Sequence, residues 1–303
     1  MYDVAIIGSG PAGYSAGIYA SRYQLKTIIF GKMIGGTVSE THKICNYPGF
    51  PEISGLDLGT RMYEHAKGTG CEIKFESVTN IEKVDNHFKI STDLKEEYEA
   101  KAVLLTIGTE RSKLTIPGED DFLGKGLSYC ATCDGNFYKD KTVGVIGGSS
   151  AATMASIMLS EVAKQVYIIY RGNELRGDPT WKAEALKKKN IDVIYNTIVT
   201  GLEGKDKLEG VKLSKPYNNS NILSLDGLFV EIGSEPNKDL AQKIGIKTDK
   251  KGYIIVDQAQ KTNIDGIWAA GDCTTNSNGF RQIATAISEG AIAANDIFKT
   301  LNT

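Results

Sequence analysis

The sequence predicts an α/β protein made of two Rossmann-like, three-layer ββα nucleotide-binding domains, the second inserted into the first. Two strand–turn–helix–strand units begin at Val4 and at Thr142, and the 303 residues are enough for two domains of ~150 residues each. Strand-like runs after the second unit return to the first domain. The predicted domains are therefore residues 1–110 with 227–303, and residues 112–226, linked at Glu110–Leu114 and around Asp226–Gly227.

Composition is that of an ordinary globular chain and excludes a disordered protein or a coiled coil, with 41% hydrophobic and 24% charged residues. The net charge of −2 gives no overall attraction to nucleic acid or to an anionic membrane. The chain opens directly on a strand pattern, so no signal peptide is expected, and no apolar run approaches the ~20 residues of a membrane span. Five scattered cysteines form no disulfide framework, which favours a reducing compartment, the cytoplasm.

The elements of the first domain follow from short apolar runs and helical spacing. Val4–Ile7 is a predicted strand, Ala12–Arg22 a helix and Lys26–Phe30 a second strand. The pattern then predicts a turn-rich loop at Tyr47–Pro51, a helix at Leu58–Thr69 and strands at Ile73–Phe75, Asn80–Val84, Phe88–Thr92, Glu97–Ala100 and Val103–Ile107.

The second domain repeats this order, and the chain then returns to the first. Its predicted elements are a strand at Thr142–Ile146, a helix at Ala151–Glu161, a strand at Val166–Tyr170, a helix at Lys182–Lys189 and short strands between Val193 and Leu225. Strands at Leu228–Ile232, Ile254–Val256 and Ile267–Ala270 and a helix at Ile283–Phe298 are expected to complete the first domain.

The turn Gly8-x-Gly10-x-x-Gly13 follows a strand and opens a helix, which is the context of a dinucleotide fingerprint. The glycines allow the tight turn, the close approach of a pyrophosphate and close helix–strand packing. A glycine-rich turn of an unrelated α/β protein is the alternative. The carboxylate that binds a ribose in this fold is missing after the second strand, where Gly31-Lys32-Met33 stands.

The second turn, Gly147-Gly148-Ser149-Ser150, departs from the fingerprint because Ser149 stands at the middle glycine. A side chain there crowds the closest approach to a pyrophosphate. Arg171 and Arg176 could still bind a nucleotide phosphate. Two interpretations stay open: a modified nucleotide site, and a nucleotide fold that has lost its nucleotide.

Cys130-Ala131-Thr132-Cys133-Asp134 lies just before the first strand of the second domain. Two thiols at this spacing can close a disulfide, and the adjacent carboxylate can exchange protons with a leaving thiolate. A zinc half-site or two structural thiols are the alternatives. Zinc needs two more ligands, and the chain has no second pair of this kind, so no metal site is predicted.

Asp272 ends a further predicted strand, and Arg281-Gln282 stands at the start of the last helix. An aspartate at the carboxyl end of a strand can bind cofactor hydroxyls, and a helix N-terminus can face a carbonyl or an anion.

Together these motifs closely resemble the low-molecular-weight thioredoxin reductases over essentially the whole chain. The motifs that carry the resemblance are Cys130–Gly135, Gly8–Gly13, Gly35-Gly36, Asn46–Gly49, Thr106–Thr109, Gly233-x-x-Pro236-Asn237 and Gly271-Asp272 with Arg281-Gln282. The resemblance implies FAD in the discontinuous domain and a homodimer. The residues it places around FAD are Gly8, Gly10, Pro11, Ala12, Gly13, Gly35, Gly36, Thr37, Asn46, Thr106, Gly108, Gly271, Asp272, Arg281, Gln282 and Ile283.

The resemblance also implies roles. Asp272 would hold the ribityl chain, with Asn46 and Gln282 near the isoalloxazine. Cys133 would face the flavin, Cys130 would attack the disulfide of a thioredoxin or glutaredoxin-like protein, and Asp134 would be the acid–base group. In this family the inserted domain rotates, so the hinge is expected at the two predicted linkers.

Departures from the family concern the pyridine nucleotide. Ser149, Tyr170 and Gly172 replace residues typical of NADPH-dependent members, and Thr37 replaces a usual glutamine. We expect weak or absent NADPH use because of Ser149 and Gly172. Relatives exist that take electrons from ferredoxin or a deazaflavin. The predicted activity is FAD-dependent reduction of a protein disulfide. Alternatives are a dithiol oxidase that uses O2 and a non-catalytic flavin redox sensor.

Overall fold

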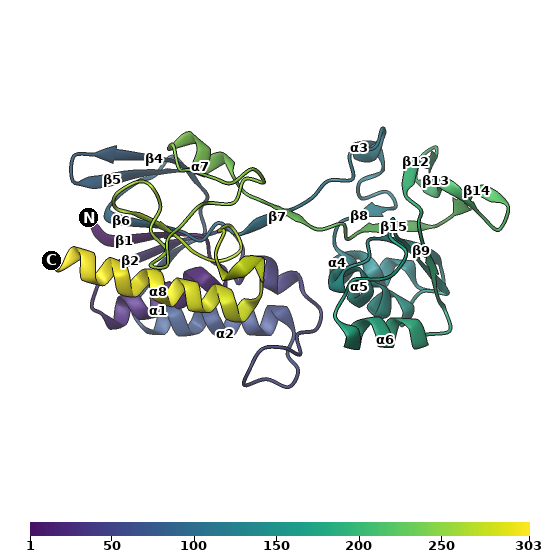
Figure 1. The fold of residues 1–303 in the computed structure, drawn as a ribbon, viewed down its shortest axis with the longest axis horizontal. Coiled ribbons are helices and arrows are strands. Elements are labelled where there is room, and N and C mark those ends of the chain that lie inside the picture. The colour runs from purple at the N-terminus through teal and green to yellow at the C-terminus, as the bar shows by residue number, and fades with distance from the viewer. The chain divides into compact units, whose positions relative to one another are not determined.

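A computed structural model describes residues 1–303, and the chain divides into two compact units. Unit 1 is Met1–Glu110 with Glu235–Thr303, and unit 2 is Arg111–Ser234 (Figure 1). The chain therefore enters unit 2 once and leaves it once.

Unit 1 is built on a seven-stranded sheet in which β3 (Glu72–Lys74), β2 (Thr27–Phe30), β1 (Tyr2–Ile7) and β6 (Glu97–Leu105) are neighbours in that order. These strands are parallel, and β17 (Ile267–Ala269) adds to β6. Ile7 lies opposite both Phe30 and Leu105. The register therefore brings the loops after β1, β2 and β6 together at one edge of the sheet.

Helices cover one face of this sheet, and an antiparallel hairpin extends the sheet beyond β6. α1 (Pro11–Arg22), α2 (Gly55–Gly68) and α8 (Ile283–Leu301) lie side by side, while β4 (Val78–Val84) and β5 (His87–Thr92) form a hairpin that pairs with β6 (Figure 1). Shorter elements of the unit are η1 (Gly36–Glu40), α7 (Asp239–Lys243) and η3 (Ser277–Gly279). Two apolar clusters fill the faces, one around Tyr14 and Trp268 and the other around Phe30 and Phe88.

Unit 2 has a parallel sheet of five strands: β11 (Ile191–Ile194), β10 (Gln165–Ile169), β9 (Thr142–Ile146), β15 (Gly227–Val230) and β8 (Leu127–Ser128), in that order. Its helical segments are α3 (Glu119–Phe122), α4 (Ala131–Asp134), η2 (Gly135–Tyr138), α5 (Ser150–Ser160) and α6 (Pro179–Lys187). A separate antiparallel sheet contains β12 (Val199–Gly204), β13 (Leu208–Tyr217) and β14 (Ser220–Ser224). Both apolar clusters of this unit are made only of its own residues.

The predicted boundary at Asp226–Gly227 is wrong. β15, expected to return to the first domain, pairs in parallel with β9 and β8 of unit 2. Asp226 anchors it, since its backbone N–H donates to the Thr142 carbonyl at 2.8 Å and its carboxylate accepts from the Thr142 N–H at 2.9 Å. A buried apolar run fits the centre of either sheet, so its composition did not identify its partner.

Two smaller predictions also differ from the structure. Glu97–Ala100 and Val103–Ile107 were expected as separate strands, but β6 is continuous, because its first half pairs with β5 and its second half with β1. Ile254–Val256 forms no strand; Ile254 makes only isolated bridges to Thr248 and Thr274.

The two segments that connect the units pair with each other. β7 (Thr109–Arg111) and β16 (Ser234–Pro236) form a two-stranded sheet. The Ser112 N–H donates to the Gly233 carbonyl at 3.0 Å, and the Asn237 amide donates to the Glu110 carboxylate at 2.7 Å.

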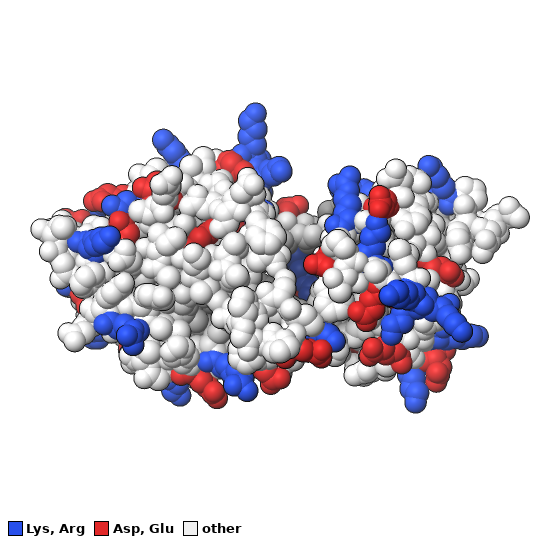
Figure 2. Space-filling view, turned by 60° about the horizontal axis from the view of Figure 1, so that its bottom comes forward, with Lys and Arg blue, Asp and Glu red and all other residues white.

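Side chains of both charges are interspersed on the face drawn in Figure 2. None of the helices combines the length and the apolar character that a membrane span requires.

Candidate functional site

Cys130 and Cys133 form a disulfide in unit 2, with their Cα atoms 5.3 Å apart. Cys130 is the N-cap residue of the short helix α4, and its Sγ accepts a hydrogen bond from the Cys133 N–H at 3.2 Å. The helical turn thus brings the two sulfurs together at the CxxC spacing. Cys133 is exposed and Cys130 is partly buried.

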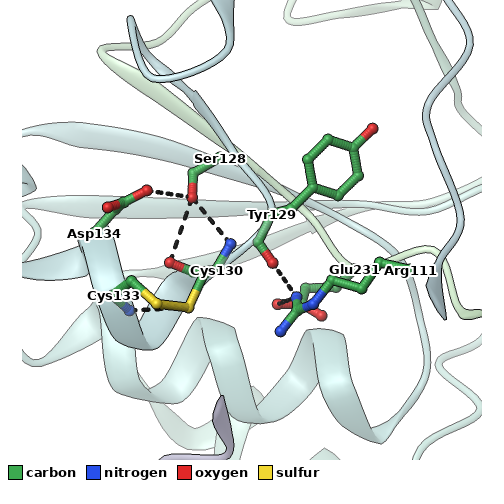
Figure 3. A network of polar contacts seen from close by, with 7 residues as sticks. All are labelled: Arg111, Ser128, Tyr129, Cys130, Cys133, Asp134 and Glu231. Atoms are coloured by element: carbon green, nitrogen blue, oxygen red, sulfur yellow. Dashed lines mark hydrogen bonds and ion pairs between the residues drawn. A yellow bond between two sulfur atoms is a disulfide. The ribbon is translucent and has the colours of Figure 1, made fainter. Parts of the chain in front are cut away.

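Ser128, which the sequence analysis did not single out, joins the disulfide to the neighbouring carboxylate (Figure 3). Its hydroxyl donates to Asp134 Oδ2 at 2.6 Å and accepts from the Cys130 N–H at 3.0 Å. The side chain is only 5% exposed, because it ends the buried strand β8. Asp134 is therefore held within the same hydrogen-bonded group as Cys130.

The chain on the other side of Cys130 is anchored as well. The Arg111 guanidinium donates to the Tyr129 carbonyl and lies 3.3 Å from a Glu231 carboxylate oxygen (Figure 3). The Tyr129 hydroxyl donates to Glu119 at 2.5 Å and accepts from the Leu114 N–H at 2.7 Å. Burial and the Glu119 carboxylate raise the pKa of Tyr129 to about 12. These contacts fix the backbone that carries the dithiol.

The first glycine-rich turn of unit 1 has the geometry that a pyrophosphate requires. A Cβ on Gly8 would lie 2.1 Å from the Thr106 carbonyl oxygen, and one on Gly13 would lie 2.0 Å from the Gly8 carbonyl oxygen, so strand and helix pack as closely as glycine allows. A Cβ on Gly10 would meet only the Gly35 carbonyl oxygen, at 4.0 Å, so the space beside this glycine is open. The N-terminus of α1, where Pro11 and Ala12 stand, has no side-chain cap and no acidic residue. An anion is therefore accommodated at this helix end.

The loops around this turn contain further predicted FAD residues. Gly36 packs against Gly10, since a Cβ on Gly36 would lie 3.2 Å from the Gly10 Cα atom. The Thr106 hydroxyl donates to the Gly8 carbonyl at 2.9 Å, and Gly108 has open space where a Cβ would stand. Thr37 is exposed in η1. The structure thus gathers these loops at the carboxyl edge of the sheet.

Asn46 and Gln282 meet although 236 residues separate them: the Asn46 amide donates to the Gln282 side-chain oxygen at 2.9 Å. Gln282 is the N-cap residue of α8, which begins at Ile283. The Arg281 guanidinium donates to the Asp272 carbonyl at 3.1 Å and stacks on the Tyr253 ring at 3.7 Å. These side chains line the same end of unit 1.

Asp272 follows Gly271 beyond β17 and is mostly enclosed. Burial raises the pKa of its carboxyl group, Arg281 opposes this shift and Glu289 adds to it. Ribityl hydroxyls near Asp272 would offer hydrogen-bond donors to this carboxylate.

Glu289 is a second residue that the sequence analysis missed. It lies on α8 and is only 5% exposed. Its carboxylate accepts from the Gly271 N–H at 2.7 Å, from the Thr274 hydroxyl at 3.0 Å and from the Ser277 hydroxyl at 2.5 Å. Glu289 therefore fixes the loop that carries Asp272. The sequence signal that could have identified this residue is a glutamate in the middle of an apolar helix.

In unit 2 other residues of the chain pack against the glycine-rich turn before α5. The Tyr170 ring packs against Gly148, where a Cβ would lie 2.5 Å from ring carbons, and against Gly172, where it would lie 2.6 Å away. The Ser150 hydroxyl accepts from the Asp178 N–H at 2.8 Å, and Gly177 packs against the Ser150 backbone.

The other residues predicted around this turn do not form a phosphate cluster. Ser149 is the N-cap residue of α5, with no side-chain hydrogen bond to the helix, and Gly147 packs against the Glu231 carbonyl oxygen. Arg171 and Arg176 are both exposed. The turn therefore still connects β9 to α5, but the Tyr170 ring packs against it.

The family model described as Pyridine nucleotide-disulphide oxidoreductase matches residues 2–290. The thioredoxin reductase of Mycoplasma genitalium is 39% identical over 295 residues, which are 97% of this chain and 93% of the relative. The chain belongs to the pyridine nucleotide-disulphide oxidoreductase family.

Solved structures agree with this assignment. The Lactococcus lactis thioredoxin reductase superimposes on this oxidoreductase with a TM-score of 0.94 and 35% identity, covering 100% of this chain and 99% of that chain. A ferredoxin-flavin thioredoxin reductase from Clostridium acetobutylicum is 35% identical, with a TM-score of 0.54, and covers 99% of this chain and 98% of that chain.

The oxidoreductase is a flavin-dependent disulfide oxidoreductase that uses FAD. Its residues fit this cofactor, because the space beside Gly10, the uncapped N-terminus of α1 and the enclosed Asp272 offer what a pyrophosphate and a polyhydroxyl chain need. When bound, FAD would supply the electron pair for reduction of a disulfide.

Proposed function

We propose that this oxidoreductase reduces the disulfide of a thioredoxin through the Cys130–Cys133 dithiol. The observation that carries the proposal is the CxxC disulfide at the start of α4, hydrogen-bonded through Ser128 to Asp134. Its relatives include thioredoxin reductases over nearly the whole chain, and none of the observations favours a dithiol oxidase or a sensor.

In the proposed reaction the Cys130 thiolate attacks one sulfur of the thioredoxin disulfide. A disulfide forms between the two proteins, and the other thioredoxin sulfur leaves as a thiolate. Cys133 then attacks the Cys130 sulfur, which re-forms the internal disulfide and releases thioredoxin with both cysteines reduced. Asp134, held by Ser128 at 2.6 Å, is placed to exchange protons with the thiols.

Single-turnover thiol exchange tests these roles without the natural electron donor. Chemically reduced enzyme is mixed with oxidised thioredoxin. We expect Cys133→Ser to trap thioredoxin as a mixed disulfide and Cys130→Ser to trap none, while Cys45→Ser, at an exposed free thiol, behaves as wild type. Trapping by Cys130→Ser alone would assign the attack to Cys133, and turnover by Cys130→Ser would contradict the dithiol mechanism.

We also propose that NADPH is a poor electron donor and that a low-potential protein such as ferredoxin replaces it. The support is the Tyr170 ring packed against Gly148, the Ser149 side chain at the middle position of the turn, and the glycine at position 172. A ferredoxin-flavin thioredoxin reductase among the structural neighbours indicates that this fold accepts such a donor.

The donor is tested by anaerobic reduction of the purified enzyme, followed by flavin absorbance. NADPH, NADH and reduced ferredoxin are added separately. We expect rapid bleaching with ferredoxin and slow, unsaturated bleaching with either pyridine nucleotide. Saturation by NADPH in the micromolar range would refute this part of the proposal and leave the dithiol mechanism intact.

We further propose a homodimer acting in the cytoplasm. Exposed apolar side chains on three adjacent helices of unit 1, Tyr19 of α1, Leu56 of α2 and Ile292 of α8, support self-association. Light scattering should give a mass of twice the 32.8 kDa chain. A mass of one chain at micromolar concentration would contradict the dimer.

A further inference from the structure

Glu76 is a buried carboxylate that the disulfide chemistry does not use. It lies two residues beyond β3 and is only 7% exposed. Its Oε1 accepts a hydrogen bond from the Tyr98 hydroxyl at 3.0 Å, whereas Oε2 has no hydrogen-bond partner in the protein. Burial of a carboxylate oxygen without a donor is unfavourable, so such an oxygen points to a missing donor.

Glu76 lines a cavity of about 400 Å³ in unit 1. The same cavity is lined by Gly8 after β1 and by Phe30 and Gly31 at the end of β2. The orphaned oxygen therefore belongs to the edge of the sheet where the first glycine-rich turn begins.

Strand register explains why Glu76 reaches this edge. β2 and β3 are parallel with Phe30 opposite Lys74, and the Gly31 N–H donates to the Lys74 carbonyl at 3.0 Å. Glu76 thus stands beside the end of β2, where the dinucleotide fold normally supplies a carboxylate for the ribose hydroxyls. β2 itself supplies none, since Lys32 follows Gly31 and pairs with Asp93 at 2.6 Å.

We propose that the Glu76 carboxylate binds the hydroxyls of the adenosine ribose of FAD. Two adjacent ribose hydroxyls are donors, which is what Oε2 lacks. Tyr98 occupies Oε1 and holds the side chain of a residue that lines the cavity. The inference rests on the use of FAD by this oxidoreductase and names the residue that replaces the missing acid after β2.

A purely structural role for Glu76 explains only half of its surroundings. The Tyr98 hydrogen bond is satisfied, and burial together with Glu76 raises the pKa of Tyr98 to about 12, which keeps its hydroxyl protonated as a donor. The other carboxylate oxygen would still be buried without a donor, on a residue that lines the cavity.

The experiment compares ADP with 2′,3′-dideoxy-ADP, each displacing FAD from the enzyme, so that only the FAD site is measured. Wild type should bind ADP about 10- to 100-fold more tightly, the range for hydrogen bonds to a charged group. In Glu76→Gln this preference should shrink to nearly nothing, and the Kd for FAD should rise by a similar factor. Glu82→Gln, at an exposed carboxylate on β4, is the matched control and should match wild type.

Equal binding of ADP and dideoxy-ADP by wild type would overturn the inference even if the variant did not fold. Equal weakening of both nucleotides by Glu76→Gln would also overturn it, because Glu76 would then act on another part of the ligand or on the fold. Glu82→Gln saturated with FAD should also keep the wild-type rate of single-turnover thiol exchange. Failure of the dithiol mechanism would instead appear in that exchange assay with nucleotide binding unchanged.

Discussion

Ser128 connects the groups that we propose to exchange electrons and protons in this oxidoreductase. One hydroxyl contacts both the Asp134 carboxylate and the backbone of Cys130. Its burial at the end of β8 leaves little freedom to either partner. Ser128 is therefore a positioning residue, which sets where Asp134 lies when a thiolate forms.

We expect Ser128→Ala to lower the rate of thioredoxin reduction about tenfold, because Asp134 loses the hydrogen bond that orients it. We also expect the pH dependence of the rate to change, because the variant lacks the hydroxyl that contacts both Asp134 and the Cys130 N–H. The measurement is single-turnover exchange between pH 5 and pH 9. Ser156→Ala, a buried serine in α5 that bonds only to the Ala152 carbonyl, is the control. An unchanged pH profile in Ser128→Ala would leave Ser128 a purely structural role.

The three free cysteines differ in environment. Burial raises the pKa of Cys273 to about 12 and raises that of Cys71, whereas Cys45 is exposed. Since the thiolate is the reactive form, alkylation of the native oxidised enzyme near pH 8 should modify Cys45 alone. Mass spectrometry of the labelled peptides checks this, with the denatured chain as the control. Rapid labelling of Cys273 in the native state would show that its surroundings open.

At the scale of elements, the site of unit 1 depends on how closely α8 approaches α1. Gly290 lies against the backbone of Ala12, and a Cβ there would lie 2.2 Å from the Ala12 carbonyl oxygen. The same two helices present the first glycine-rich turn and the Gln282 cap.

We expect Gly290→Ala to destabilise the enzyme by about 1–3 kcal/mol and to weaken FAD binding, because a backbone atom cannot move aside without separating the helices. Gly68→Ala in α2 is the matched control. It has open space at its Cβ position and no positive φ, so it should be neutral or stabilising. Urea unfolding and FAD titration check both variants. Equal effects of the two would contradict the packing argument.

The end of β10 offers a test of the nucleotide turn. Gly172 cannot simply become arginine, because its Cβ would lie 2.6 Å from the Tyr170 ring. We expect Gly172→Arg alone to gain no NADPH use, whereas Ser149→Gly, Tyr170→His and Gly172→Arg together should lower the half-saturating NADPH concentration about tenfold or more. Flavin bleaching by NADPH is the measurement. Equal gains by the single and triple variants would show that the ring does not obstruct the turn.

At the scale of the whole molecule, each unit has its own apolar clusters, and only two segments connect them. The proposed FAD residues all lie in unit 1. A ligand stabilises only the unit that binds it, by about 4 kcal/mol at a thousandfold excess over Kd.

Calorimetry of the FAD-free enzyme should therefore show two transitions, of which added FAD raises one and leaves the other in place. The Glu76→Gln variant should need a higher FAD concentration for the same rise in the temperature of that transition. A single transition that moves as a whole with FAD would show that the two units unfold together, contrary to the separate clusters.

Much of this protein was determined by local sequence. The α/β class, both glycine-rich turns and the redox dithiol follow from hydrophobic periodicity, from glycines that permit close backbone approach, and from two cysteines within one helical turn. Each of these signals lies within about a dozen residues, so the amino-acid sequence alone is enough to identify it.

The tertiary structure decided the rest. It assigned β15 to the sheet of unit 2, joined Asn46 to Gln282, buried Glu289 under the Asp272 loop and brought Glu76 beside Gly31. These contacts join segments far apart in the chain or depend on which parallel strands become neighbours. A buried apolar strand can pair with any sheet of suitable register, so its sequence does not identify its neighbours. The role of a glutamate depends on the residues that surround it in the fold. Burial and strand order are properties of the folded chain.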